Sequence, residues 1–244
     1  MTILQHLGPF DTAILATSLS AAILYGLRIR TPPDHLRMIL KASSTALLSL
    51  LCLVAGKSWL LVAALAFGAL GDAFLAWPGE AAFLRGLGSF LTGHLLYVGL
   101  FVRFGRGVDL ILAESWRRLL GVTILALAPA MGLVLVPRVG PCLRLPIAVY
   151  SAVSLCVVSA ALTVPRWHTV TGTILFALSD CLLGADEFVL PADSKHRVWT
   201  QYAVWGLYYG GQLLIVSWFT DGGWFTSGSG RWETSVSYSA SLDG

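Results

Sequence analysis

The fold of this chain is decided by the stretch Phe67–Phe101, which reads FGALGDAFLAWPGEAAFLRGLGSFLTGHLLYVGLF. It contains two apolar runs joined by a short polar corner, a pattern that predicts two membrane-spanning helices. Each helix carries one group that hydrocarbon solvates poorly: Asp72 near the end of the first and His94 near the middle of the second. An isolated charge at the centre of a bilayer costs at least ~2.5–3.5 kcal/mol, so Asp72 marks a candidate functional site.

The composition extends this membrane prediction to the whole chain. Of the 244 residues, 56% are hydrophobic and 12% are charged, and the mean hydropathy is +0.76. Soluble domains carry about 25% charged residues. We therefore expect an all-α polytopic membrane protein, a single bundle of about eight transmembrane helices. The net charge of +3 is scattered, with no basic block, which argues against a nucleic-acid partner.

Apolar runs and the breaks between them place the spans. The bundle is predicted to fill residues 1–219, whereas the Gly- and Ser-rich segment 220–244 is expected to be a polar, disordered tail. The segment from Arg106 to Arg118 is expected to be a polar, interfacial connection between the fourth and fifth spans. The eight spans are expected at residues 11–29, 37–55, 58–77, 83–104, 118–136, 143–164, 168–185 and 198–219.

A second intramembrane acid repeats the pattern of Asp72. Asp180 lies in the apolar stretch Phe176–Gly184 (FALSDCLLG), and both acids have small neighbours that let another helix approach closely. The third and seventh spans run in the same direction, and each carries its acid nearer its exit end. We therefore expect both carboxyls to face one buried site. Alternatively, Asp72 reaches interfacial water, and Asp180 caps a neighbouring helix or pairs with Lys41.

Other polar residues are expected at matching depths. Lys41 and Tyr150 fall within about two helical turns of the face where the two acids lie, and His94 falls near mid-depth. Lys41 either extends to the surface, supplies a counter-charge or binds phosphate. His94 shares a helical face with Phe90 and Tyr97, and it is either a hydrogen-bonded packing residue or part of the site.

The last span carries a polar and aromatic face. Its residues either contribute to the site or form interhelical hydrogen bonds beside a Gly206–Gly210 helix contact of the GxxxG type, and the second interpretation is slightly favoured. The residues of this face are Trp205, Tyr208, Tyr209 and Gln212.

These residues resemble the YhhN-like family of lysoplasmalogenases. The resemblance covers residues 37–218 and rests on the order and spacing of its elements. It departs mildly from the family at Ala42, where proline is more usual, and at Gly93, where alanine is. The matching elements are Lys41, GDAFL (Gly71–Leu75), GHLLY (Gly93–Tyr97), Tyr150, LFALSDCLL (Leu175–Leu183) and YYGGQLLI (Tyr208–Ile215).

The resemblance implies an eight-span membrane enzyme that hydrolyses the vinyl ether bond of lysoplasmalogens. The substrates are 1-alkenyl glycerophosphocholine or glycerophosphoethanolamine, and the products are a fatty aldehyde and a glycerophosphodiester. Protonation of the vinyl ether needs a general acid and a nearby negative charge, which Asp72 and Asp180 can supply as catalytic residues without a metal or cofactor. The residues expected to bind substrate are Lys41, His94, Tyr97, Tyr150, Tyr208, Tyr209 and Gln212.

Three other classes of protein remain open from the residues alone. Paired intramembrane acids also serve proton-coupled transporters. A zinc amide hydrolase would need several intramembrane histidines, and only His94 is predicted inside the bundle. A purely structural scaffold would not need both acids. Within the favoured interpretation the partner is a lysophospholipid, the oligomeric state is open, and the protein resides in the endoplasmic reticulum of a eukaryote or the cytoplasmic membrane of a bacterium.

Overall fold

The computed structural model describes residues 8–191 and 193–220, and within these residues all regular secondary structure is helical. Its eight long helices confirm the predicted all-α bundle, and no predicted end differs from the observed one by more than three residues. Beyond Thr220, the predicted tail lies outside the described residues. The long helices are α1 (Pro9–Arg28), α2 (His35–Val54), α3 (Trp59–Leu75), α4 (Glu80–Phe104), α6 (Ser115–Leu135), α7 (Pro141–Ala161), α8 (Trp167–Phe188) and α9 (His196–Thr220).

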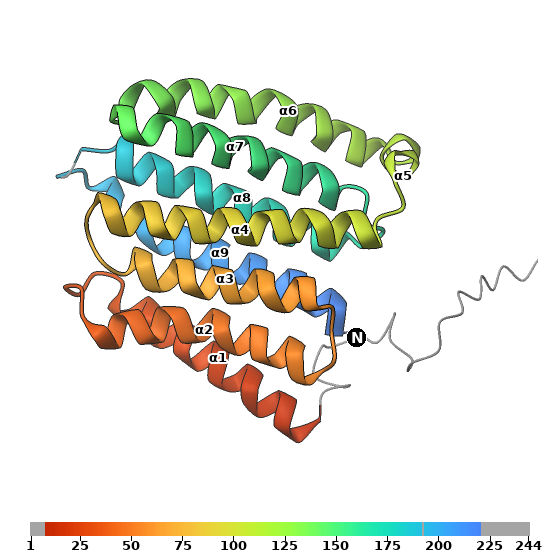
Figure 1. Ribbon diagram of the computed structural model, residues 1–244, viewed down its shortest axis with the longest axis horizontal. Coiled ribbons are helices and arrows are strands. Elements are labelled where there is room, and N and C mark those ends of the chain that lie inside the picture. Colours follow the sequence, from red (N-terminus) through yellow and green to blue (C-terminus); the bar gives the residue numbers. More distant parts are fainter. Residues whose placement is uncertain (1–7, 192, 221–244) are drawn as a thin grey trace, which may run out of the picture.

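The long helices lie side by side and alternate in direction along the chain (Figure 1). Helices α1 to α4 pack against one another in chain order, and α4 then packs against α7. Helix α9 packs along α8 and also contacts α2 and α1, so it connects the two halves of the bundle. Because the long helices alternate in direction, α3 and α8 end at the same end of the bundle, as the sequence predicts.

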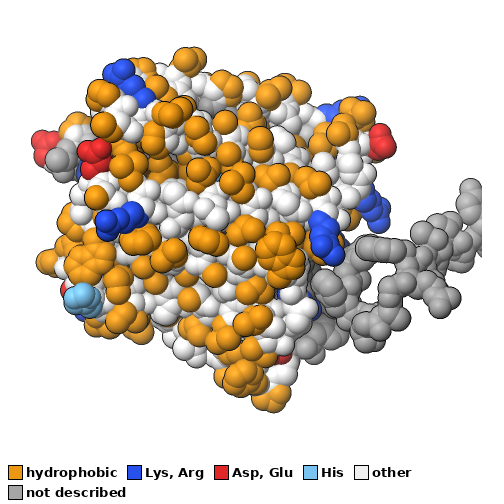
Figure 2. Space-filling model, in the orientation of Figure 1, with side chains coloured by type: hydrophobic (Ala, Val, Ile, Leu, Met, Phe, Trp, Pro, Cys, Tyr) orange, Lys and Arg blue, Asp and Glu red, His pale blue; other side chains and the backbone are white. Residues whose placement is uncertain are grey.

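The surface has the pattern expected of a protein embedded in lipid. Hydrophobic side chains cover the flank of the bundle, whereas most charged side chains gather at its two ends (Figure 2). Six helices in the described part of the chain are long and apolar enough to cross a membrane, namely α1, α2, α4, α7, α8 and the segment Ser115–Arg138. Helix α3 is apolar but shorter, with 17 residues. The protein is therefore an all-α polytopic membrane protein.

The connection between α4 and α6 differs from the prediction. Helix α6 begins at Ser115, and the preceding segment holds a short helix, α5 (Val108–Ala113), so residues 115–118 belong to a span. Arg117 is buried, and its Nη1 donates hydrogen bonds to the carbonyl oxygens of Leu162 (2.7 Å) and Val164 (2.8 Å), which follow the end of α7. Its Nε donates to Glu114, and this bond holds the pKa of the Glu114 carboxyl below its usual value.

The backbones of α8 and α9 approach closely at a glycine pair, Gly172 and Gly211, that the sequence prediction missed. A Cβ atom added to Gly172 would lie 2.7 Å from the carbonyl oxygen of Gly211, and one added to Gly211 would lie 2.6 Å from that of Gly172. Gly206 and Gly210 have no such neighbour within 4 Å. The expected GxxxG contact at Gly206 and Gly210 is therefore wrong, because those residues lie on a different side of α9 from the contact with α8.

This packing predicts opposite effects for two alanine substitutions. Gly172→Ala should lower the free energy of unfolding by about 1–3 kcal/mol, because the added methyl group meets rigid backbone. Gly206→Ala, the matched control, should raise it by up to about 1 kcal/mol, because alanine favours helix and the site is open. The apparent melting temperature of each purified variant in detergent measures the difference. Equal effects of the two substitutions would contradict the observed contact.

Candidate active site

Asp72 lies in the last turn of α3 and is almost fully enclosed, with 1% of its surface exposed. Thr45 Oγ1 and Tyr208 Oη each donate a hydrogen bond of 2.9 Å to its Oδ2. Lys41 Nζ lies 3.6 Å from its Oδ1. The alternative in which Asp72 reaches interfacial water is therefore wrong. The carboxyl is instead held by α2 and α9, and two hydroxyls and an ammonium group favour its ionised form.

Small residues before Asp72 allow its partners to come close. A Cβ atom added to Gly71 would lie 2.6 Å from the ring of Phe90 on α4, and one added to Gly68 would lie 3.1 Å from the Tyr208 hydroxyl. A larger residue at Gly71 would require the Phe90 ring to shift, and one at Gly68 would crowd the Tyr208 hydroxyl. The small-residue context noted in the sequence thus serves the close helix approach that it predicts.

Asp180 lies on α8 and is held by two other helices. Tyr150 on α7 donates a hydrogen bond of 3.0 Å to its Oδ2, and His94 Nε2 on α4 lies 3.3 Å from the same oxygen. The other ring nitrogen of His94, Nδ1, lies 2.8 Å from the carbonyl oxygen of Phe90. Asp180 therefore does not pair with Lys41, as one alternative held. The sequence allowed His94 to be either a packing residue or part of the site, and the structure shows that it contacts Asp180 directly.

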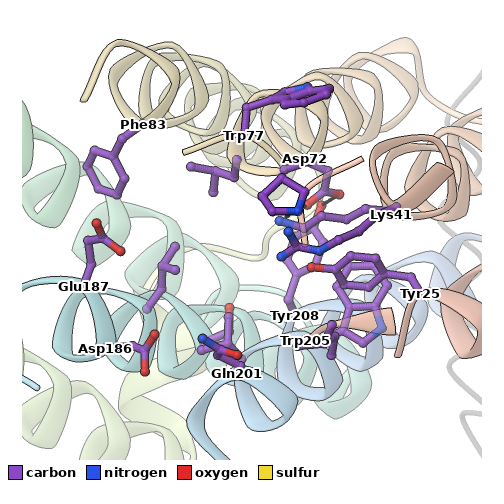
Figure 3. Close-up of a pocket in the computed structure, with 18 of the residues that line it drawn as sticks. Tyr25, Lys41, Asp72, Trp77, Phe83, Asp186, Glu187, Gln201, Trp205 and Tyr208 are labelled. Atoms are coloured by element: carbon purple, nitrogen blue, oxygen red, sulfur yellow. Dashed lines mark hydrogen bonds and ion pairs between the residues drawn. The ribbon is translucent and has the colours of Figure 1, made fainter. Parts of the chain in front are cut away.

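Both aspartates line one cavity of about 340 Å³. It lies at the end of the bundle where α3 and α8 end, because Pro33, Pro78 and Gly79 from the turns there also line it. Figure 3 shows Lys41 and Asp72 beside Tyr208, with Asp186 and Glu187 on the other side of the cavity. Asp72 and Asp180 thus share one polar space although 108 residues separate them in the sequence.

A second cavity, of about 490 Å³, adjoins the first. It lies between α4, α6, α7 and α8, and its lining is mostly aliphatic and aromatic, with Tyr150 among its few polar residues. Asp180 is the charged residue among those that line both spaces, and it therefore stands where a polar cavity meets an apolar one. The residues common to both cavities are Leu75, Phe83, Phe90, Asp180 and Leu183.

Four of the predicted substrate-binding residues line neither cavity: His94, which contacts Asp180, and the three residues Tyr97, Tyr209 and Gln212. The Tyr97 hydroxyl donates a 2.5 Å hydrogen bond to Gln212 Oε1, and both side chains are buried between helices. The Tyr209 hydroxyl is hydrogen-bonded to Ser18 on α1, at 2.7 Å. For these three residues the structure corresponds to the alternative of interhelical hydrogen bonding. Tyr208 differs, because it faces the cavity and donates to Asp72.

The sequence prediction missed Thr45, a partner of Asp72, and several residues that line the polar cavity. Thr45, which donates to Asp72, lies four residues after Lys41 and so on the same helical face, a spacing that could have identified it. Tyr25 lies at the end of α1, where nothing in the local sequence indicates a role. Arg37 and Gln201 lie in the first turns of α2 and α9. They line the cavity because both helices begin at the end of the bundle where the cavity lies.

The described residues, 8–191 and 193–220, contain no group of three or more His, Cys, Asp and Glu side chains that could hold a metal ion. The chemistry available from the chain itself is that of acids and bases. Asp72, surrounded by donors, can hold a negative charge. Asp180, which accepts a hydrogen bond from Tyr150 and lies 3.3 Å from His94 Nε2, can exchange a proton. Lys41 and Arg37 add positive charge to the wall of the same cavity.

The fold and the site define a class: polytopic helical membrane proteins in which two carboxyls from different helices line one cavity inside the bundle. Sequence comparison is more specific. The chain belongs to the YhhN family, whose sequence model matches residues 36–218.

Relatives in this family carry a common name. Human Lysoplasmalogenase TMEM86B is 36% identical over 160 residues, covering 66% of this chain and 63% of that protein. The Lysoplasmalogenase of Mycobacterium bovis is 33% identical over 171 residues, covering 68% of this chain and 62% of that protein. The chain thus spans less than two thirds of the length of these relatives. No solved structure matches it.

The pairing of Lys41 with Asp72 predicts a coupled effect on stability. Lys41→Met should lower the free energy of unfolding by about 3 kcal/mol, because it leaves a buried carboxylate without its counter-charge. The same substitution in an Asp72→Asn background should cost much less. Apparent melting temperatures of the two single variants and the double variant measure this coupling.

A matched control is Lys57→Met, which removes a lysine from the turn between α2 and α3, outside the cavity lining. We expect its effect to be the same with Asp72 or Asn at position 72. If Lys41→Met lowers the free energy of unfolding equally in both backgrounds, the Lys41–Asp72 pair does not stabilise the bundle.

Proposed function

We propose that this protein is a lysoplasmalogenase, which hydrolyses the vinyl ether bond of 1-alkenyl glycerophosphocholine or glycerophosphoethanolamine. One observation carries the proposal: Asp180 stands where the polar cavity meets the apolar one. In a lysoplasmalogen the vinyl ether lies at the corresponding point, between a polar glycerophosphate portion and a long hydrocarbon chain. The names of the relatives support the same activity.

Charge and polarity orient the substrate in one direction. The phosphate group lies toward Lys41 and Arg37, the cationic residues of the polar cavity, because an ammonium and a guanidinium both bind phosphate oxygens. The alkenyl chain lies in the apolar cavity between α4, α6, α7 and α8. This placement brings the vinyl ether to Asp180, with Asp72 lining the same polar cavity as the glycerol portion.

The two carboxyls supply the chemistry that a vinyl ether requires. One donates a proton to the carbon β to the ether oxygen, and the π electrons of the double bond form the new C–H bond. The resulting oxocarbenium ion is stabilised by the other, ionised carboxylate. Water adds to the cationic carbon and returns a proton, and the hemiacetal then separates into a fatty aldehyde and a glycerophosphodiester. No metal or cofactor takes part in these steps.

A proton-coupled transporter is the second candidate, because intramembrane acids also carry protons across membranes. The apolar cavity beside Asp180 favours the lipid hydrolase, since a polar solute would not bind in a space lined mainly by hydrocarbon side chains. The two candidates differ in detergent, where no compartments exist. There an enzyme releases aldehyde from a lysoplasmalogen, and a transporter leaves the lipid unchanged.

The proposed partner in the cell is the lysophospholipid substrate, which reaches the site within the membrane. The proposed residence is the endoplasmic reticulum of a eukaryotic cell or the cytoplasmic membrane of a bacterium, where such lipids are handled.

Removing either acid should abolish turnover. Asp72→Asn and Asp180→Asn each leave a side chain of the same size without an ionisable group, so we expect a rate loss of about 10²-fold or more. Mass spectrometry of lysoplasmalogen incubated with each purified variant measures the aldehyde and the glycerophosphodiester. Near-normal turnover in both variants would refute the scheme, and Asp109→Asn, on the short helix α5, serves as the matched control.

Filling the apolar cavity should change the preference for chain length. Ala177 lines that cavity, so Ala177→Phe is expected to raise KM about tenfold for a substrate with a long alkenyl chain and much less for one with a short chain. Ala152→Phe is the matched control. It adds the same ring on the exposed side of α7 and should leave the KM of both substrates unchanged. An equal change for both chain lengths with Ala177→Phe would place the chain elsewhere.

A further inference from the structure

The contacts of Asp180 differ from those of Asp72, and this difference separates their roles. Asp72 receives two hydroxyl hydrogen bonds and faces the ammonium group of Lys41, three contacts that suit a carboxylate. Asp180 receives one hydrogen bond, from Tyr150, and it also contacts His94. What passes between Asp180 and His94 depends on where the protons of the histidine ring lie.

The proton on one ring nitrogen of His94 follows from its partner. Nδ1 lies 2.8 Å from the carbonyl oxygen of Phe90, and a carbonyl oxygen only accepts hydrogen bonds, so Nδ1 carries a proton. Nε2 lies 3.3 Å from Asp180 Oδ2, and if neither atom carried a proton, two lone pairs would face each other, so one of the two atoms carries a proton. Either the imidazole is doubly protonated beside a carboxylate, or a neutral imidazole accepts from a carboxylic acid. Both descriptions hold one shared proton.

Aromatic rings lie against the histidine of the pair. His94 is buried, and its ring is packed between the rings of Tyr150 and Phe176, with centroid distances of 4.9 and 4.8 Å. With the shared proton the pair is electrically neutral, and without it the pair carries one negative charge. Asp180 meanwhile lines both cavities, and His94 lines neither.

We infer that His94 and Asp180 store one proton together and that Asp180 is the group that delivers it to the vinyl ether carbon. This inference rests on the proposed function. His94 acts through Asp180 as a positioning residue, and Asp72 is the carboxylate that stabilises the oxocarbenium ion. In the first step the O–H bond of Asp180 breaks as the C–H bond forms. When water then adds to the cation, its surplus proton returns to the pair, and the cycle closes without any other reactant.

A pH profile tests this inference, because turnover requires the shared proton. The rate of the wild-type protein should fall on the alkaline side as the pair loses it. In His94→Gln an amide N–H faces Asp180, donates to the ionised carboxylate and so favours loss of the proton. We expect this alkaline limb to move to lower pH by about one unit or more. The rate at the optimum should fall about 100-fold, with KM changed far less.

Tyr150→Phe gives a second test with the opposite sign. The Tyr150 hydroxyl donates to Asp180, so its removal disfavours the ionised carboxylate and should move the alkaline limb to higher pH. The other titratable groups that line the two cavities with Asp180 and Tyr150 are Cys181 and, in the polar cavity, Tyr25, Arg37, Lys41, Asp72, Asp186, Glu187 and Tyr208. None of them is altered in either variant, so the two opposed shifts report on Asp180.

The outcomes separate the inference from the proposed function. If the wild-type protein releases no aldehyde at any pH, the proposed function fails. If the wild-type protein is active and His94→Gln lowers the rate equally at every pH, His94 is only a packing residue and the inference is overturned. If His94→Gln does not fold, Tyr150→Phe decides. An alkaline limb that stays fixed or moves to lower pH in Tyr150→Phe overturns the inference. His168→Gln, at the start of α8, is the matched control and should leave the profile unchanged.

Discussion

The cost of holding a carboxylate inside a membrane-spanning bundle governs the structure. Asp72 is almost fully buried, and it is tolerated there because Lys41, Thr45 and Tyr208 all face it. These partners come from α2 and α9, so two early helices and the last one meet at one side chain. Close helix packing at Gly68 and Gly71 then follows, since the polar contacts form only when the helices lie near one another.

Helix α9 shows how one element serves both the site and the bundle. Neighbouring residues on a helix point about 100° apart, so Tyr208 and Tyr209 face different partners. Tyr208 donates to Asp72 at the cavity, whereas Tyr209 is bonded to Ser18 on α1. One turn later Gln212 accepts a hydrogen bond from Tyr97. The polar face of α9 therefore divides into a part that contacts the site and a part that connects helices.

Much of the fold was predictable from the sequence because lipid imposes simple rules. Apolar runs of sufficient length, closed by prolines and charged corners, located every long helix, and the depth of Asp72 and Asp180 followed from counting residues. The partners of these acids were less predictable, because a partner depends on how each helix is rotated. The glycine contact shows this limit: Gly172 and Gly211 belong to no shared motif, yet the two backbones meet closely there, whereas Gly206 and Gly210 have no such neighbour within 4 Å.

The division into two cavities also bears on where the binding energy for a lipid arises. A hydrocarbon chain that moves from the bilayer into the apolar cavity exchanges one apolar surrounding for another, so little hydrophobic free energy is gained. Affinity must then come from the polar cavity, where Lys41 and Arg37 offer positive charge. The apolar cavity selects by shape alone, and its wall from α6, the least buried of the candidate spans, adjoins lipid. A site built in this way places the reacting bond by holding the polar end of the substrate and letting the chain follow.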